Sequence, residues 1–310
     1  MNSSNPFEKD SKDELDPFPL ADALNHTILM HRDVHFGGKF EFMLDYYRNA
    51  GKGSIEDLSI DAIEALEAQE IGMQTDLAGI FLTGAEAERI SEAKDAYKKL
   101  RDLYETPSAQ NRHMRLIADL ILSEEDEPAQ EIAAIVAERG VIVPALIELL
   151  RAEDFYDPLF PGYGFAPDLA ARCLGKIGDK RAIYSLFESL GEGDFFNDDI
   201  ALHALKLIGE PAKQFLLKVL HTRPLNMDNE RAAIALEEFK DDPEVATACF
   251  QMLKELDIKQ NEILATYLIL ACEGLVDTPY KVEFEALAKN AALPKSIKQD
   301  MRLVADRWKG

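Results

Sequence analysis

The fold is set by residues 168–183, which read DLAARCLGKIGDKRAI. Two similar stretches follow: IALHALKLIGEPAKQ over residues 200–214 and ERAAIALEEFKDDPEV over residues 230–245. The same positions recur every 31 residues, as in Ala170, Ala201 and Ala232, in Leu174, Leu205 and Leu236, and in Ile177, Ile208 and Phe239. A fixed period of about 20 to 50 residues is typical of stacked repeat proteins. We therefore expect pairs of short helices, with the three leucines buried at equivalent points of successive units.

Short turns divide each repeat, at Gly178-Asp179, Gly209-Glu210 and Asp241-Asp242. The first copy also carries a set of small and apolar residues around its turn, namely Ala171, Leu174, Gly175, Ile177, Ala182, Ile183 and Leu186. With these residues, the chain resembles the HEAT-like repeats of the bilin-lyase type over about residues 128–256. In that family a Gly-Asp turn joins the two helices, and a small alanine allows them to pack closely. The second copy has Glu210 in place of the aspartate, and the third has Lys240 where the glycine stood.

The resemblance implies an all-α fold, an alpha-alpha superhelix or HEAT-like solenoid, with a helical N-terminal extension. It implies no single activity, because the family includes chromophore-attaching proteins and also scaffolds without chemistry. Residues 1–127 resemble no family that we can identify.

Composition divides the chain into three parts. Residues 1–19 are polar, contain prolines and have no period, so we expect a disordered tail. Residues 20–127 are predicted to form a helical N-terminal region that ends at a run of acids. Residues 128–310 are predicted to form the repeat solenoid. Its last helices, which lose the strict period as capping units do, are expected over residues 261–274, 279–290 and 294–308.

The chain is strongly acidic, with 34 Lys and Arg against 57 Asp and Glu and a net charge of −23. Nucleic-acid and anionic-membrane surfaces are therefore disfavoured as partners, because both are bound through Lys and Arg. A protein partner, if charged, is expected to be basic. The N-terminus has no apolar signal region, and the most apolar stretch, residues 265–276, is too short for a membrane span. We expect a cytoplasmic protein.

The sequence carries no recognisable catalytic motif. It has no GxSxG and no His-Glu dipeptide, and the kinase-like HRD at residues 31–33 has no glycine-rich loop before it. Cys173, Cys249 and Cys272 lie in apolar helical stretches without a histidine at helical spacing, so buried free thiols are expected. These observations predict a protein that is not an enzyme and that has no cofactor.

Two histidines form a weak candidate for a metal site. His31 and His35 are four residues apart and would share one face of a helix, with Asp33 or Glu41 as a third ligand. Two histidines alone are more often ordinary imidazoles at a helix end, so no metal is predicted.

The unusual segment of the repeat region is FYDPLFPGYGF, residues 155–165. Together with the next link between repeats, it supplies the candidate partner-binding residues Phe155, Tyr156, Phe160, Tyr163, Phe165, Phe195 and Phe196. Residues 152–199 contain ten acids and four bases, so these rings would be set in an acidic rim suited to a basic, hydrophobic peptide. The alternative is that the rings fold back and cover the core between repeats.

The sequence therefore favours a non-enzymatic scaffold or adaptor for a basic or hydrophobic protein partner. One alternative is an enzyme or accessory protein of the bilin-lyase type that holds a tetrapyrrole or similar ligand on its concave face. Another is a structural subunit of a larger complex.

Overall fold

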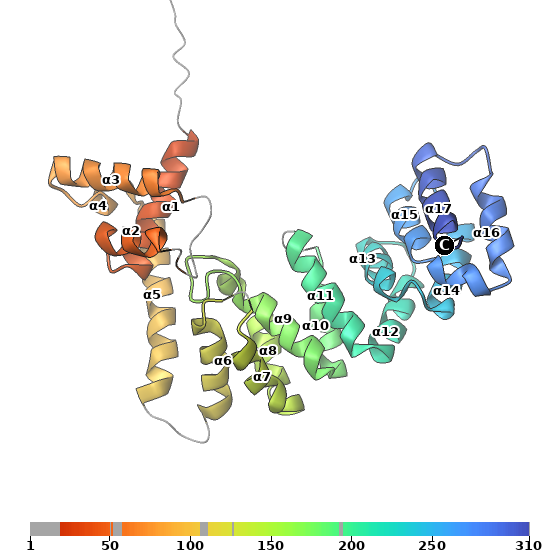
Figure 1. Cartoon of the computed structure of the whole chain (residues 1–310), viewed down its shortest axis with the longest axis horizontal. Coiled ribbons are helices and arrows are strands. Elements are labelled where there is room, and N and C mark those ends of the chain that lie inside the picture. The colour runs from red at the N-terminus through yellow and green to blue at the C-terminus, as the bar shows by residue number, and fades with distance from the viewer. Residues whose placement is uncertain are drawn as a thin grey trace, which may run out of the picture. The chain divides into compact units, whose positions relative to one another are not determined.

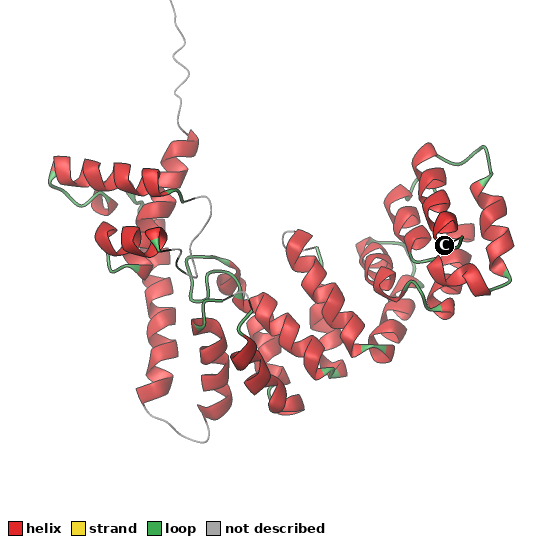
Figure 2. Ribbon diagram, in the orientation of Figure 1, coloured by secondary structure: helices red, strands yellow, loops and turns green. Residues whose placement is uncertain are grey.

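The computed structural model describes residues 19–49, 51, 58–105, 111–125, 127–191 and 195–309. Over these residues the chain forms helices α1 to α17 and no strand, which confirms the all-α prediction (Figures 1 and 2). None of these helices is long and apolar enough to cross a membrane. The predicted tail lies outside the described residues up to residue 18, and α1 begins at Pro19.

The chain divides into two compact units, residues 1–99 and residues 100–310. The sequence placed this boundary later, at the acidic run before residue 128. The reason for the difference lies in α6 (Arg112–Leu122), whose Ile117, Leu120 and Ile121 belong to the same apolar core as the repeats. An apolar helix face therefore decides the boundary, and the run of charges does not.

The first unit is built from four helices and most of a fifth. They are α1 (Pro19–His35), α2 (Phe40–Arg48), α3 (Ile60–Met73), α4 (Ala78–Phe81) and α5 (Gly84–Glu105). A capping box opens α5: the Thr83 amide donates to Glu86 Oε2 at 2.6 Å, and the Glu86 amide donates to Thr83 Oγ1 at 3.3 Å. The small apolar core of this unit includes Ile28, Met43 and Ile63.

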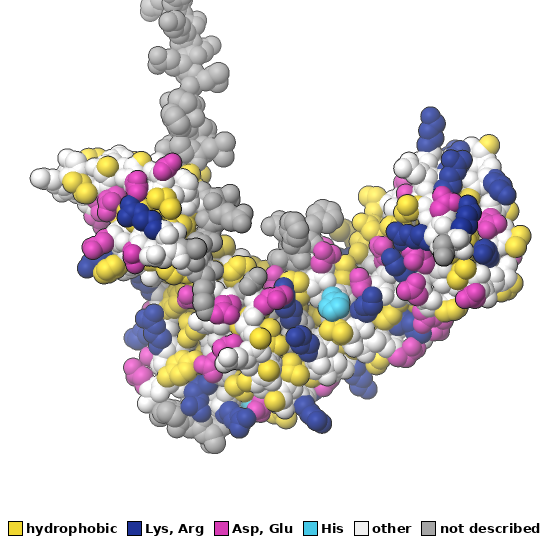
Figure 3. Space-filling view, viewed as in Figure 1, with side chains coloured by type: hydrophobic (Ala, Val, Ile, Leu, Met, Phe, Trp, Pro, Cys, Tyr) yellow, Lys and Arg dark blue, Asp and Glu magenta, His cyan; other side chains and the backbone are white. Residues whose placement is uncertain are grey.

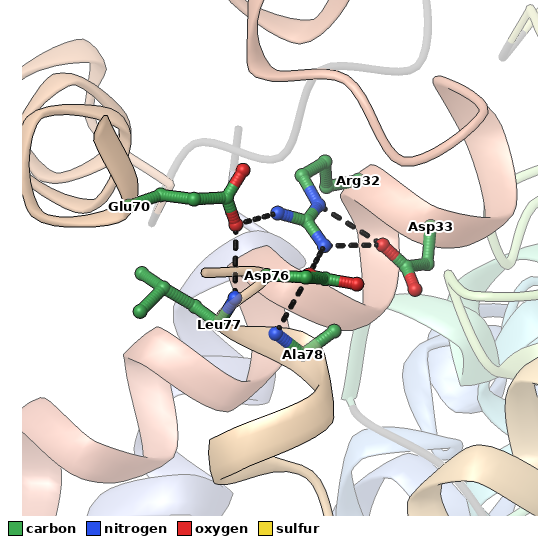
Figure 4. A network of polar contacts seen from close by, with 6 residues as sticks. All are labelled: Arg32, Asp33, Glu70, Asp76, Leu77 and Ala78. Atoms are coloured by element: carbon green, nitrogen blue, oxygen red, sulfur yellow. Dashed lines mark hydrogen bonds and ion pairs between the residues drawn. The ribbon is translucent and has the colours of Figure 1, made fainter. Parts of the chain in front are cut away.

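A buried arginine ties α1 to α3 and α4 (Figure 4). Arg32 is 1% exposed and donates hydrogen bonds to Glu70 at 2.6 Å and to Asp76 at 2.8 Å. Asp33 accepts two more from the same guanidinium, at 2.9 and 2.8 Å. Burial opposes the charged form of Arg32, but these hydrogen bonds outweigh it and raise the pKa. Glu70 and Asp76 also accept the backbone amides of Leu77 and Ala78, so the network fixes the start of α4.

The second unit consists of helix pairs that pack against their neighbours along the chain (Figure 1). Its helices after α6 are α7 (Ala129–Ala137), α8 (Val143–Leu150), α9 (Ala166–Ile177), α10 (Ile183–Glu188), α11 (Phe195–Ile208), α12 (Glu210–Leu220), α13 (Met227–Leu236), α14 (Pro243–Glu255), α15 (Glu262–Leu270), α16 (Tyr280–Ala288) and α17 (Lys295–Arg307). Contacts join α8 to α9, α9 to α11, α12 to α13 and α13 to α15. The last three helices match the predicted end helices in number and place.

The 31-residue period corresponds to a structural period. Leu174, Leu205 and Leu236 lie on α9, α11 and α13, and all three are fully buried, which confirms the predicted register. Small residues bring the first two of these helices together: a Cβ added to Gly175 would lie 2.7 Å from the Cα of Ala204. Only glycine allows this approach of the two backbones.

Polar links connect the turns of successive repeats. Gly178 ends α9 with a φ of 72°, and Asp179 then accepts the backbone amide of Arg181 at 2.9 Å. Arg181 donates from Nη2 to the carbonyl of Gly140, in the preceding turn, at 2.5 Å. Further along, the buried Lys213 donates to Asp242 at 2.8 Å, and this hydrogen bond is the main cause of its raised pKa.

Candidate functional site

A groove of about 810 Å³ crosses the second unit where several helices meet. It lies among α8, α9, α10, α11, α13 and the short 3-10 helix Glu153–Tyr156. The residues that line it are Leu150, Arg151, Glu153, Tyr156, Asp168, Ala171, Ser185, Glu188, Ser189, Ala201 and Arg231. Its volume is within the range of small-ligand and peptide sites, which is roughly 300–1,000 Å³.

Local sequence explains how the lining is placed. Asp168 lies in the first turn of α9, and Ala171 follows it one helical turn later. Ser185 begins a face of α10 that continues with Ser189, because residues four apart share one side of a helix. Ala171 and Ala201 are buried alanines, so their small side chains leave the space that the groove occupies.

The charged residues that line the groove differ in whether a residue of opposite charge is paired with them. Arg151 and Glu188 form an ion pair at 2.7 Å, but both side chains are about half exposed and the pair contributes little stability. Asp168 is partly buried, and this burial raises its pKa to about 6, against a smaller opposing effect of Arg172. Near neutral pH, Asp168 is therefore a carboxylate that accepts hydrogen bonds, and it becomes protonated in mildly acidic solution.

Two polar groups of the lining have no hydrogen-bond partner among the described residues. Ser185 is buried, and its hydroxyl makes no hydrogen bond there. The Nε of Arg231 is buried without a partner, while its Nη1 lies 3.7 Å from Asp228. By contrast, the hydroxyl of Ser189 donates to the carbonyl of Leu186 at 3.0 Å. The groove is thus lined by Ser185, whose hydroxyl makes no hydrogen bond with a described residue, and by Arg231, whose Nε is buried without a partner.

The predicted aromatic surface is largely part of the core. Phe160 and Tyr163 are 2% and 8% exposed, so they cannot form an exposed docking surface, and that expectation is corrected for both. Phe155 and Phe165 are partly buried against the same core. Tyr156 alone of the five lines the groove, with its hydroxyl donating to the carbonyl of Leu150 at 2.9 Å.

Backbone conformation turns these rings inward. Gly162, Tyr163 and Gly164 have φ values of 90°, 51° and 85°, and two turns are closed by the Tyr163 amide donating to the Phe160 carbonyl and the Phe165 amide donating to the Gly162 carbonyl. The glycines permit this path because they have no Cβ. The side chains of the other two candidates, Phe195 and Phe196, lie outside the described part of the structure, and a binding role for them stays a prediction.

The two histidines considered as metal ligands pack as aromatic rings. Their centroids are 5.1 Å apart, and His35 Nδ1 lies 3.0 Å from the hydroxyl of Tyr97. Asp33, one possible third ligand, is bonded to Arg32. Over the described residues, no group of three or more His, Cys, Asp or Glu side chains is placed to hold a metal ion.

The three cysteines are free and buried, as the sequence predicted. Burial raises the pKa of the Cys173 and Cys249 thiols to about 12, and it raises that of Cys272 as well. A thiol is a nucleophile only as the thiolate, so these side chains are suited to packing and not to covalent chemistry.

Sequence reasoning missed Ser185 and Arg231 as candidate site residues. Neither belongs to a motif, and 46 positions separate them along the chain. The sequence signals near the groove are Tyr156, one of the predicted partner-binding residues, and Ala171, one of the small residues of the first repeat. In comparisons with protein-family models, curated proteins and solved structures, nothing matches this chain.

Proposed function

We propose that residues 100–310 form a HEAT-like solenoid that binds an extended segment of a partner protein in the groove around Ser185 and Arg231. On this proposal the protein is a non-enzymatic scaffold or adaptor. The proposal combines the repeat pattern of the sequence with the lining of the groove.

The unused polar groups of the groove are the observation that carries the proposal. A buried donor without a partner costs about 1–3 kcal/mol relative to one that is hydrogen-bonded. The Nε of Arg231 carries this cost in the free protein, and the Ser185 hydroxyl makes no hydrogen bond with a described residue. An extended peptide would remove it, since each of its peptide units offers a carbonyl acceptor. Its amide groups, or a basic side chain, would in turn donate to Asp168.

The charge around the groove favours a basic segment. The lining of the groove has three acids, Glu153, Asp168 and Glu188, against two bases, Arg151 and Arg231, and the sequence of residues 152–199 has a net charge of −6. Such a rim raises the rate of encounter with a basic partner and disfavours acidic ones. The buried polar groups of the wall would then hold the segment in place.

A comparison of Ser185, on α10, with Ser189, directly after it, tests the proposal. Binding of a displayed library of random peptides to the full chain selects ligands, and the selected peptides are measured against Ser185→Ala and Ser189→Ala. We expect Ser185→Ala to keep or raise the stability and to weaken peptide binding about fivefold or more, because its hydroxyl is bonded only in the complex. Ser189→Ala should slightly lower the stability, since it loses the bond to Leu186, and should leave binding unchanged.

Arg231→Met provides a second test, because methionine keeps much of the apolar length and removes the donor. We expect a larger loss of peptide binding than for Ser185→Ala, with the fold retained by circular dichroism. Selected peptides that bind all three variants with equal affinity would refute the groove as the binding site.

The volume of the groove also favours a second candidate, a small-ligand holder of the bilin-lyase type. A volume of about 810 Å³ would accommodate a drug-sized or tetrapyrrole ligand. Visible absorbance of the protein purified from its native source, lost in Arg231→Met, would support this candidate over the peptide-binding scaffold.

A further inference from the structure

The first unit exposes apolar side chains at the turn that joins α3 to α4. We call residues 71–81 the α3–α4 tip. Ile71 is 70% exposed, and the other large apolar residues that are exposed on the tip are Met73 at 49%, Ile80 at 50% and Phe81 at 38%. Figure 3, viewed as Figure 1, shows apolar side chains on the surface at this end of α3 and α4. Four such residues within eleven positions are unusual for a surface with no binding role.

Neither the backbone conformation nor the packing of the first unit requires glycine at two positions of the tip. Gly72 lies in α3 and Gly79 in α4, and neither has a positive φ. A Cβ added at either position would meet nothing within 4 Å. Glycine inside a helix is less favourable than alanine, so the first unit gains no stability from these residues. They would, however, let the backbone of a partner come close.

The charge around the tip indicates a basic partner. Residues 58–82 contain five acids and neither Lys, Arg nor His. Three of the acids are paired, Glu64 with Arg48 and both Glu70 and Asp76 with Arg32, while Asp61 and Glu67 form no ion pair with a described residue. The last turn of α3 has no basic residue either.

We infer that the α3–α4 tip is a docking surface for a basic amphipathic helix of a partner protein. The apolar side of that helix contacts Ile71, Met73, Ile80 and Phe81. Its lysines or arginines meet Glu67, one turn before Ile71, and, at the far end of α3, Asp61. A second copy of this chain lacks the matching charge, because each copy carries −23. This surface is separate from the groove of the second unit and does not depend on the function proposed there.

Crosslinking with a synthetic peptide tests the inference. The probe is an amphipathic helix of leucine and lysine that carries a photoactivatable group, and its control has glutamate in place of lysine. With the full chain, we expect crosslinks from the lysine probe to fall on residues 71–81 and to decline as salt is raised. The glutamate control should give none. Crosslinks spread over other acidic surfaces would overturn the inference.

Matched variants separate docking from folding. The double variant Ile71→Ser/Ile80→Ser should weaken binding of the lysine probe about tenfold. The control Val282→Ser/Ile263→Ser changes two exposed residues of the second unit and should leave that binding unchanged. Gly72→Ala and Gly79→Ala should keep or raise the stability of the protein. Both should still weaken binding of the probe, because the added methyl group occupies space that the bound helix needs. Equal affinity of the parent and all tip variants would contradict the inference.

Oxidation of methionines checks that the tip is open in the free chain. Met73 and Met227 are both exposed, at 49% and 67%, while Met252 is buried. In dilute hydrogen peroxide we expect Met73 to oxidise at a rate close to that of Met227 and well above that of Met252. If Met73 is protected even at low protein concentration, the chain itself covers the tip. If protection appears only at high protein concentration, a second copy covers it. Either result would overturn the assignment to a basic partner.

Discussion

The two units of this protein are held together by different forces. In the second unit, a periodic set of leucines and alanines is buried, and polar links join the turns of successive repeats. In the first unit, the apolar core is small, and a buried arginine with three carboxylates joins the helices. Burial of apolar surface is not directional, whereas an ion network needs every partner in place. The first unit should therefore respond more sharply to the loss of one side chain.

The units also differ in what they leave unsatisfied. The second unit leaves polar groups without partners in its groove, and the first gathers four exposed apolar side chains within the eleven residues of the α3–α4 tip. A polar groove suits a segment that brings its own hydrogen-bonding groups, while an exposed apolar surface suits an amphipathic helix. The difference suggests two binding surfaces with separate ligands.

The largest effect is expected from Arg32→Ala. Its loss leaves Glu70 and Asp76 without their cation, and breaking a buried ion network costs about 3–5 kcal/mol. The chain has one tryptophan, Trp308, so its fluorescence follows the second unit alone. In urea, we expect an early circular dichroism transition from the first unit and an unchanged tryptophan transition. A single shifted transition seen by both probes would show that the two units unfold together.

A smaller effect, confined to the second unit, is expected from Leu205→Ala. Truncating a buried leucine costs about 2–5 kcal/mol, depending on how far the cavity collapses. The tryptophan transition should therefore move to lower urea, while the part of the circular dichroism signal from the first unit stays in place. A tryptophan transition that overlays the parent would contradict the repeat register.

Two glycine substitutions should change the stability of the protein in opposite directions. Gly175→Ala places a methyl group against Ala204 and should cost about 1–3 kcal/mol, because α9 and α11 must move apart. Gly72→Ala should be neutral or stabilise by up to about 1 kcal/mol, because its Cβ enters open space and alanine favours the helix. Thermal melts measure both, and a destabilised Gly72→Ala would reveal a packing role that the structure does not have.

The smallest expected effect is a difference between the two units in how their stability depends on pH. The hydrogen bond from Arg32 lowers the pKa of Asp76 below 3.8, so its contribution is present above that pH and is lost as the pH falls further. The pKa of Asp168 is raised from 3.8 to about 6, so the folded second unit binds this proton more tightly than the unfolded chain does. The contribution of Asp168 to the stability of the second unit should therefore rise on acidification from about pH 7 towards pH 4. Asp168→Asn should flatten this rise in the tryptophan transition, and Glu188→Gln should not.

The repeat region could be predicted in detail because its signals are local and repeated. Each 31-residue unit carries its own apolar stripe, turn residues and small residues, so the burial of Leu174, Leu205 and Leu236 follows from the sequence. The capping box of Thr83 and Glu86 was predictable for the same reason, since its two residues are three apart.

The boundary between the units, the direction of the aromatic rings and the site residues depended on distant contacts. The sequence of residues 155–165 is compatible with exposed or buried rings, and packing against the repeat core decided that Phe160 and Tyr163 are buried. Asp33 is adjacent to Arg32 in the sequence, but Glu70 and Asp76 contact Arg32 only because α3 and α4 pack against α1. Likewise, Ser185 and Arg231 face one groove because several repeats pack together. The sequence alone determined the helices and their period, since these follow from neighbouring residues. The tertiary structure decided which polar groups stay unpaired, because that depends on every residue packed around them.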